Sequence, residues 1–199
     1  MNTTISIIII DDLLPDDDPV IALLKRDYHE VKLIKSPQEG IEYITSHLSY
    51  RHIVILDYKF AQNEPDGAFV LEKIREKSKI IPVILWTANG NMITELESFI
   101  NNKAFAMVPK APYEELLSKI KEAENFINNS VEGALEEWIK LEGQESLERP
   151  FLIAADGKEY TLAQLLSEIR MQSNFGKKIE KDLLMLTIDL LIRKKENLK

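Results

Sequence analysis

The stretch HIVILDY, residues 52–58, sets a short and strongly apolar run directly before an aspartate. A continuous β-branched run of this length is typical of a strand that is buried on both faces, as in a parallel sheet. The same signature returns in IIIIDD (7–12) and PVILWTA (82–88), and the shorter runs VKLIK (31–35) and AFAMV (104–108) follow it. The sequence therefore predicts five strands of one parallel sheet.

Helical patterns separate these strands. Asp18 followed by Pro19 indicates an N-cap with proline in the first helical turn, and the helix that follows would turn Val20, Leu23 and Leu24 inward. Apolar spacing predicts further helices over residues 38–47, 67–77 and 91–101, and another that begins near Pro112. Strands that alternate with helices predict an α/β fold, in which a doubly wound five-stranded parallel sheet carries helices on both faces.

A helical apolar stripe continues from Leu116 to Leu141, and the sequence NNS at 128–130 could interrupt it. The stripe is compatible with one long helix or with two. It also leaves open whether this segment is a dimerising signalling helix or an ordinary packed connection between domains. A polar stretch at 142–150 then reads as a linker.

A separate small module is expected after this linker. FLIAA (151–155) predicts a strand, DGKE (156–159) carries an Asp-Gly hairpin signal, and Thr161 with Gln164 has the spacing of a capping box. A last helix over 177–195 would face its core with Ile179, Leu183, Leu186 and Leu190. We therefore expect a domain over 1–128, a helical extension and linker over 129–150, and a small α+β or mainly helical interaction module over 151–199.

Composition excludes several classes of function. The chain has no cysteine, so disulfides, thiolate metal sites and cysteine nucleophiles are ruled out. The formal net charge is −8, which argues against strong non-specific attraction to nucleic acid. The apolar run at 5–10 is too short for a signal peptide or a membrane span, so a cytoplasmic protein without membrane contact is expected.

Charged and hydroxyl side chains fall at the C-terminal ends of four predicted strands: Asp11 with Asp12, Asp57, Thr87 and Lys110. The C-terminal ends of parallel strands share one edge of the sheet, where ligands bind. Three clustered carboxylates need a cation, and oxygen ligands favour a hard ion such as Mg²⁺. A carboxylate beside such an ion can attack phosphorus, while a lysine offsets the charge of the transferring phosphoryl group.

The motifs IIIIDD, HIVILDY, PVILWTA and MVPKAPYEEL occur in an order and at spacings that resemble the receiver domains of two-component response regulators, over about residues 4–128. The resemblance implies a flavodoxin-like receiver fold and a phosphoacceptor at Asp57. It implies direct Mg²⁺ binding by Asp12, Asp57 and the backbone carbonyl of Lys59, and binding through water by Asp11. Thr87 and Lys110 would contact the phosphoryl group.

The same resemblance implies that the phosphoryl donor is a sensor histidine kinase or a phosphotransfer protein. The chain would then be no enzyme in the usual sense, but a phosphoacceptor that promotes its own phosphorylation and slow dephosphorylation. Its output would pass through a protein partner of the C-terminal module or through self-association, such as a homodimer. The alternatives are a DNA-binding transcriptional regulator and a phosphoryl shuttle or sink without direct output.

The sequence departs from the receiver pattern at three places. Lys110 is followed by Ala111, and proline, whose peptide bond is cis in the family, comes one position later. Met107 occupies the position of the family's switch aromatic, with Phe105 expected on the same strand face. The loop after Asp57 is about two residues longer than in the family. The acidic run at 16–18 resembles extra metal ligands but is better explained as a helix cap.

Overall fold

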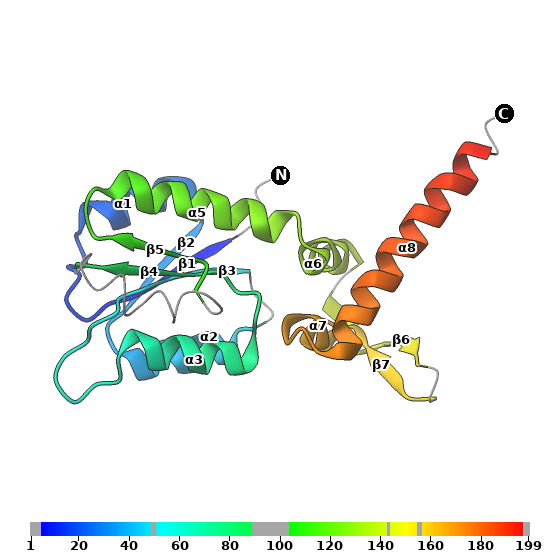
Figure 1. Ribbon diagram of the computed structural model, residues 1–199, viewed down its shortest axis with the longest axis horizontal. Coiled ribbons are helices and arrows are strands. Elements are labelled where there is room, and N and C mark those ends of the chain that lie inside the picture. The colour runs from blue at the N-terminus through cyan, green and yellow to red at the C-terminus, as the bar shows by residue number, and fades with distance from the viewer. Residues whose placement is uncertain (1–4, 49–50, 89–103, 143, 155–156, 197–199) are drawn as a thin grey trace. The chain divides into compact units, whose positions relative to one another are not determined.

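The protein is described by a computed structural model that covers residues 5–48, 51–88, 104–142, 144–154 and 157–196 (Figure 1). The helix expected over 91–101 lies outside these described residues. The chain divides into two compact units, Met1–Asn129 and Ser130–Lys199. Each unit has its own hydrophobic core, and each is therefore described by itself.

The first unit is built on a five-stranded parallel sheet in the order β2-β1-β3-β4-β5. The three strands at its centre, β1, β3 and β4, are buried at every position, as their unbroken apolar runs require. The predicted doubly wound α/β sheet is confirmed. The strands are β1 Ser6–Ile10, β2 Glu30–Ile34, β3 His52–Leu56, β4 Val83–Thr87 and β5 Ala106–Pro109.

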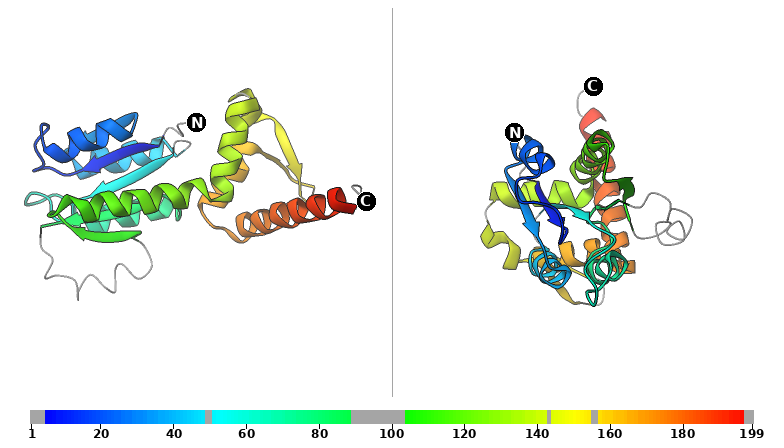
Figure 2. Two further views of the ribbon diagram at one scale, coloured as in Figure 1. Left: turned by 90° about the horizontal axis from the view of Figure 1, so that it is seen from above. Right: turned by 90° about the vertical axis from the view of Figure 1, so that its left-hand side faces the viewer.

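Helices cover both faces of this sheet (Figures 1 and 2). One core forms between the sheet and α1 with α5, and a second between the sheet and α2 with α3. The Asp18 side chain accepts a hydrogen bond from the amide of Val20, which confirms the predicted cap of α1. The helices are α1 Pro19–Asp27, α2 Pro37–Ser46, α3 Gly67–Lys77 and α5 Tyr113–Asn128.

Two details of the sequence prediction need correction. Leu23 of α1 is only half-buried, and Ile21 is buried in its place beside Val20 and Leu24. The fifth strand begins at Ala106 and not at residue 104, so Phe105 lies before the strand. The apolar stripe marked which segments are buried, but packing against neighbouring elements determined which of their residues face the core.

The second unit begins with α6, Val131–Glu142, so the long apolar stripe belongs to two helices that break at 129–130. Leu135 and Ile139 of α6 pack against Leu162 and Leu166 of α7. The predicted hairpin and capping box are both present, since Thr161 and Gln164 bond reciprocally. After α6 come a 3-10 helix at Gln144–Glu148, strands β6 Pro150–Ile153 and β7 Glu159–Thr161, α7 Leu162–Arg170 and α8 Asn174–Glu196.

The prediction for α8 was wrong in its second half. Ile179 is buried and Leu183 is half-buried against α7, as expected, but Leu186 and Leu190 are 56% and 58% exposed. The helix continues beyond the elements of its own unit (Figure 2). Across the described parts of the chain, none of the helices is long and apolar enough to cross a membrane.

Candidate functional site

The carboxylates of Asp11 and Asp57 meet at the C-terminal edge of the sheet. Asp11 follows β1, Asp57 follows the neighbouring β3, and both residues are buried. The ammonium of Lys110, from the loop after β5, donates to Asp11 Oδ2 and to Asp57 Oδ2, at 2.7 Å in each case. Three residues separated by 46 or more positions in the sequence therefore form one ion-paired cluster, as the strand-end pattern predicted.

Asp12 completes an acidic triad with these two aspartates. Each of the three residues offers one carboxylate oxygen, and these oxygens lie within 4.8 Å of one another. The amide of Ala61, in the loop after β3, donates to Asp12 Oδ2 at 3.0 Å. Asp12 Oδ1 is buried and has no hydrogen-bond partner in the structure. An oxygen of this kind carries a desolvation penalty that a bound cation would offset.

Backbone amides also hold the carboxylates of Asp11 and Asp57 in place. Asp11 Oδ1 accepts from the amides of Leu13 and Leu14, at 2.9 and 2.8 Å. Asp57 Oδ1 accepts from the amide of Tyr58 at 2.7 Å, and the amide of Lys59 lies at 3.5 Å. Each of these two aspartates thus keeps one oxygen on the backbone and the other on Lys110.

Gly67, at the start of α3, lies very close to the backbone of Asp57 and Tyr58, just after β3. A Cβ atom at this position would lie 2.3 Å from the carbonyl oxygen of Asp57 and 2.8 Å from the Cα of Tyr58. The Gly67 amide also donates to the carbonyl of Tyr58 at 2.9 Å. The sequence did not reveal this constraint, because it depends on the path by which the loop after β3 returns to the end of that strand. Only glycine permits this approach, which fixes the backbone beneath the Asp57 carboxylate.

The cluster has an excess of negative charge, because three aspartates face one lysine. Burial raises the pKa of Asp57, and the hydrogen bond and charge of Lys110 offset only part of that rise. Burial alone would lower the pKa of Lys110, but its bonds to Asp11 and Asp57 outweigh this and raise it. One ammonium among three carboxylates leaves the cluster acidic, so it favours an added cation.

The donor atoms of the cluster fit Mg²⁺. The three aspartates offer carboxylate oxygens, which hard cations prefer, and each of them accepts a hydrogen bond from a backbone amide. The unpartnered Asp12 Oδ1 is the structural observation that points to a further ligand at this place. The residues Asp11, Asp12 and Asp57 therefore could hold such an ion together.

The other predicted site residues lie beside the cluster. Thr87 is buried at the end of β4, and its carbonyl accepts from the amide of Lys110 at 3.0 Å. Lys59 is exposed in the loop after β3. Trp86, which the sequence did not mark as part of the site, is buried with its ring centre 5.6 Å from the Lys110 ammonium. The only sequence signal that could have indicated Trp86 was its position directly before Thr87.

The segment around β5 differs from the receiver pattern in two ways. The cis peptide bond lies between Ala111 and Pro112, one position later than a Lys-Pro bond would place it. Met107 packs on the core beside α2 and α3, whereas Phe105 packs on the opposite core and contacts Phe126 of α5, with ring centres 5.7 Å apart. The prediction that Phe105 shares a strand face with Met107 was wrong, because Phe105 precedes the strand and escapes its alternation.

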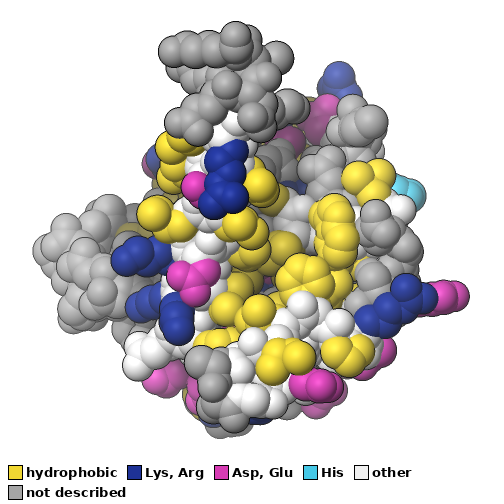
Figure 3. Space-filling model, turned by 90° about the vertical axis from the view of Figure 1, so that its right-hand side faces the viewer, with side chains coloured by type: hydrophobic (Ala, Val, Ile, Leu, Met, Phe, Trp, Pro, Cys, Tyr) yellow, Lys and Arg dark blue, Asp and Glu magenta, His cyan; other side chains and the backbone are white. Residues whose placement is uncertain are grey.

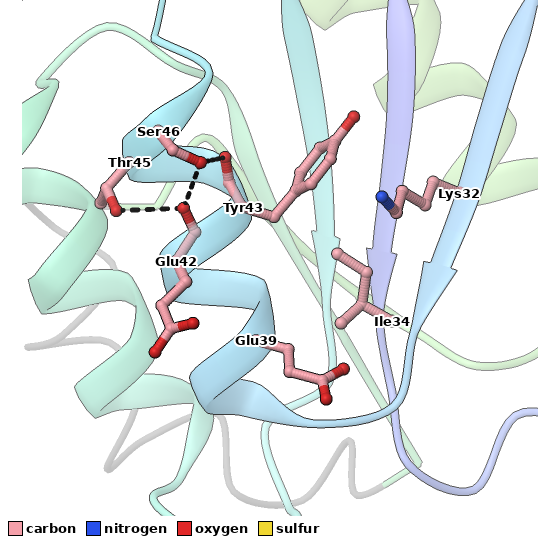
Figure 4. Close-up of a pocket in the computed structure, with 7 residues that line it drawn as sticks. All are labelled: Lys32, Ile34, Glu39, Glu42, Tyr43, Thr45 and Ser46. Atoms are coloured by element: carbon pink, nitrogen blue, oxygen red, sulfur yellow. Dashed lines mark hydrogen bonds between the residues drawn. The ribbon is translucent and has the colours of Figure 1, made fainter.

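A groove of about 610 Å³ lies elsewhere, between β2 and α2 (Figure 4). Lys32 stacks over the ring of Tyr43 at 3.8 Å. The hydroxyls of Thr45 and Ser46 donate to carbonyls of their own helix, so neither is directed as a nucleophile into the groove. Neither of these two hydroxyls is therefore placed as a nucleophile, and the acidic cluster is the candidate site.

Solved structures share the fold of the first unit. A CheY-like response regulator receiver domain protein from Methanospirillum hungatei matches with a TM-score of 0.50 at 24% identity, over 63% of this chain and 98% of that chain. The response regulator StyR matches with a TM-score of 0.52 at 18% identity, over 72% of this chain and 73% of that chain. NtrX from Brucella abortus, solved in complex with ATP, matches with a TM-score of 0.51 at 23% identity. The match covers 82% of this chain and 33% of that chain.

No protein-family model and no curated protein sequence matches the chain. At these identities the solved structures establish only the fold, so the chemistry of the site has to be inferred from the residues of this chain. The sheet order, the helices on both faces and the acidic triad at the C-terminal edge agree with that fold. The chain is therefore built on a domain with the receiver (CheY-like) fold, joined to a C-terminal unit of unassigned fold.

Proposed function

We propose that this protein is a response regulator that accepts a phosphoryl group on Asp57 from a sensor histidine kinase or a phosphotransfer protein, in a reaction that depends on Mg²⁺. The observation that carries the proposal is the ion-paired cluster itself. Asp57 is buried beside Asp11 and Asp12, and Lys110 donates to it at 2.7 Å. A buried nucleophilic carboxylate with a cationic neighbour suits phosphoryl transfer.

In the proposed reaction an Asp57 carboxylate oxygen attacks the phosphorus atom of a phosphohistidine. The P–N bond breaks as the P–O bond forms, and the leaving imidazole takes up a proton. The Tyr58 amide fixes one Asp57 oxygen, which orients the carboxylate for attack. Lys110 then exchanges its contact with the carboxylate for one with the phosphoryl oxygens, and the Thr87 hydroxyl donates to another of them.

Bound Mg²⁺ would neutralise the carboxylates and the phosphoryl oxygens during transfer. Asp12 and Asp57 would hold the ion directly, with the Lys59 carbonyl as a third ligand, and Asp11 would bind it through water. Asp12 Oδ1 is available for this role because it is buried without a partner. Asp16 and Asp17, in contrast, are exposed and outside the triad, and Asp18 caps α1, which supports the interpretation of this run as a helix cap.

The proposed output passes through the C-terminal unit by protein–protein contact or self-association. Residues 131–199 contain 11 Lys and Arg against 13 Asp and Glu, so the region has no net positive charge with which to attract DNA. Lys177, Lys178 and Lys181, the lysines of α8 whose side chains the structure describes, are exposed and interleaved with Glu180 and Asp182. We expect gel-shift assays with genomic fragments to show no salt-dependent binding. A clear shift would favour the transcriptional regulator instead.

The proposal is tested by incubating the chain with acetyl phosphate and Mg²⁺ and following phosphoprotein formation on a phosphate-binding gel. The wild type and Asp16→Ala should be labelled equally, since Asp16 is exposed and outside the triad. Asp57→Ala should not be labelled, and omission of Mg²⁺ should abolish labelling of the wild type. Equal labelling of Asp57→Ala would overturn the proposal.

A response regulator with an output module and a phosphoryl sink differ in whether phosphorylation leads to a cellular response. If residues 143–199 form an effector module, their deletion should remove the cellular response while phosphorylation of Asp57 continues. If the chain is only a sink, the deletion should leave the response unchanged. Release of phosphate from many small esters would point to a phosphohydrolase, which is a different class of protein.

A further inference from the structure

The second half of α8 is an apolar helix segment without a core of its own. Its first half packs on α7 through Phe175, Ile179 and Leu183. The following segment exposes seven large apolar side chains, and no described element of the unit covers them. These residues, called the α8 patch below, are Leu184 (54% exposed), Met185 (57%), Leu186 (56%), Ile188 (49%), Leu190 (58%), Leu191 (63%) and Ile192 (55%).

The α8 patch encircles the helix and does not form a single stripe. At 100° per residue, the seven side chains cover all sides of the segment, and only Thr187 and Asp189 interrupt them. A helix that is apolar all round is a buried helix in a protein core or assembly. An ordinary surface helix, or one that lies in the plane of a membrane, would keep a broad polar face, whereas Thr187 and Asp189 lie on opposite sides of this segment.

The extent of the patch matches an interface. Taking roughly 180 Å² for a fully exposed aliphatic residue, the α8 patch presents on the order of 700 Å² of apolar surface. That exceeds the largest apolar patch of a typical monomer, about 300–600 Å², and approaches the roughly 800 Å² that each partner contributes to a stable interface. Figure 3 shows hydrophobic side chains gathered side by side on the face that presents this unit.

We propose that the occupant of the α8 patch is the α8 patch of a second copy of this chain, so that the protein is a constitutive homodimer. A two-fold symmetric interface uses the same surface on both copies, and an aliphatic surface is its own complement. The described charges near the patch, Asp182, Asp189 and Arg193, are of both signs, and Arg193 already pairs with Asp189 at 2.9 Å. Among the charged side chains that the structure describes here, none forms a single-sign surface that would select an acidic or basic partner.

This inference goes beyond the proposed function, and it rests on that function only in treating the C-terminal unit as the interaction module. The contact does not involve the acidic cluster, because the α8 patch and the cluster belong to different units. We therefore expect the dimer to form with or without phosphorylation of Asp57, so either proposal can fail alone.

Sedimentation equilibrium on the full chain tests the dimer. The wild type and Asp57→Ala should both have twice the 22.9 kDa mass of one chain at micromolar concentration. The double variant Leu186→Glu, Leu190→Glu should have the mass of one chain. Its circular dichroism should keep the helical content, since both side chains are more than half exposed. Phe69→Glu serves as the control, because Phe69 is a 42% exposed aromatic residue of α3, in the first unit.

A dimeric double variant, or a wild type of single-chain mass, would overturn the proposal. The second result would mean that the first unit of the same chain, or a different protein, covers the α8 patch. If the double variant does not fold, Leu191→Lys gives the same test at the most exposed position of the patch. Its mass should then be halved relative to the wild type.

Discussion

Asp12 connects the acidic triad to the loop after β3 through only one of its two carboxylate oxygens. One accepts from the Ala61 amide, and the other is buried without a partner. Asp12→Asn removes one negative charge from a cluster in which Lys110 pairs with the other two carboxylates. We expect the variant to be at least as stable as the wild type without Mg²⁺, because repulsion among the carboxylates decreases.

Added Mg²⁺ should stabilise the wild type but not Asp12→Asn. An ion at 100 times its dissociation constant stabilises a folded protein by about 2.7 kcal/mol, which a thermal melt detects. Asp16→Asn removes the same charge from an exposed position and should respond as the wild type does. An equal response of Asp12→Asn to Mg²⁺ would exclude Asp12 as a ligand.

Replacement of Gly67 would disturb the backbone at Asp57 without changing a charge. A Cβ atom there would lie 2.3 Å from the Asp57 carbonyl oxygen, so α3 or the strand end must shift. We expect Gly67→Ala to lower the free energy of unfolding by about 1–3 kcal/mol, the usual effect of overpacking. Urea denaturation measures this change. Ala68→Gly, one position later in α3, should cost about 1 kcal/mol or less, and equal losses would refute the crowding argument.

At the scale of elements, Tyr28 connects the end of α1 to α5. Its hydroxyl donates to Glu124 Oε2 at 3.2 Å. Burial, and then the charge of Glu124, raise the pKa of Tyr28 above its ordinary value of 10.0. The neutral form is therefore favoured in the folded state. The stability that this raised pKa contributes is complete below the pKa of Tyr28 in the unfolded chain, near pH 10. It is lost as the pH rises toward the higher pKa of Tyr28 in the folded protein.

We expect the stability of the wild type to fall when the pH rises above about 10. Tyr28→Phe cannot ionise, so its stability should fall less steeply over the same range, although it loses the hydrogen bond at neutral pH. Denaturant midpoints measured between neutral and alkaline pH would show the difference. Parallel curves for the two proteins would rule out Tyr28 as the group that titrates.

The elements of the sheet could be predicted because their signal is local. An unbroken Ile and Val run is buried on both sides whatever its neighbours are, and the aspartate after it then lies at the sheet edge. The face of Phe105 and the exposure of Leu186 could not be predicted in this way. Periodicity identifies an apolar side of a segment, but the start of a strand and the length of its neighbours decide what covers that side.

In the site, too, some features could be predicted from the sequence and others could not. Asp11, Asp57 and Lys110 were brought together by topology, which the sequence pattern determines. The Ala61 amide on Asp12, the approach of Gly67 and the position of Trp86 depend on loop geometry and side-chain packing. No spacing in the sequence encodes those contacts.

At the scale of the whole molecule, the two units have separate cores. We expect residues 1–129 alone to fold and to keep the stabilisation by Mg²⁺, because the acidic triad and Lys110 lie entirely within that unit. A thermal melt of this fragment with and without Mg²⁺ checks the expectation. Loss of the Mg²⁺ response in a folded fragment would mean that the C-terminal unit contributes to the site.

The central claim concerns one bond, the acyl phosphate on Asp57. Borohydride reduces an acyl phosphate to an alcohol, so the phosphorylated chain can be trapped and digested, and the modified residue identified by mass spectrometry. We predict that residue 57 alone is converted to homoserine, and only when Mg²⁺ is present during phosphorylation. Conversion at Asp11 or Asp12, or at no aspartate, would contradict the account.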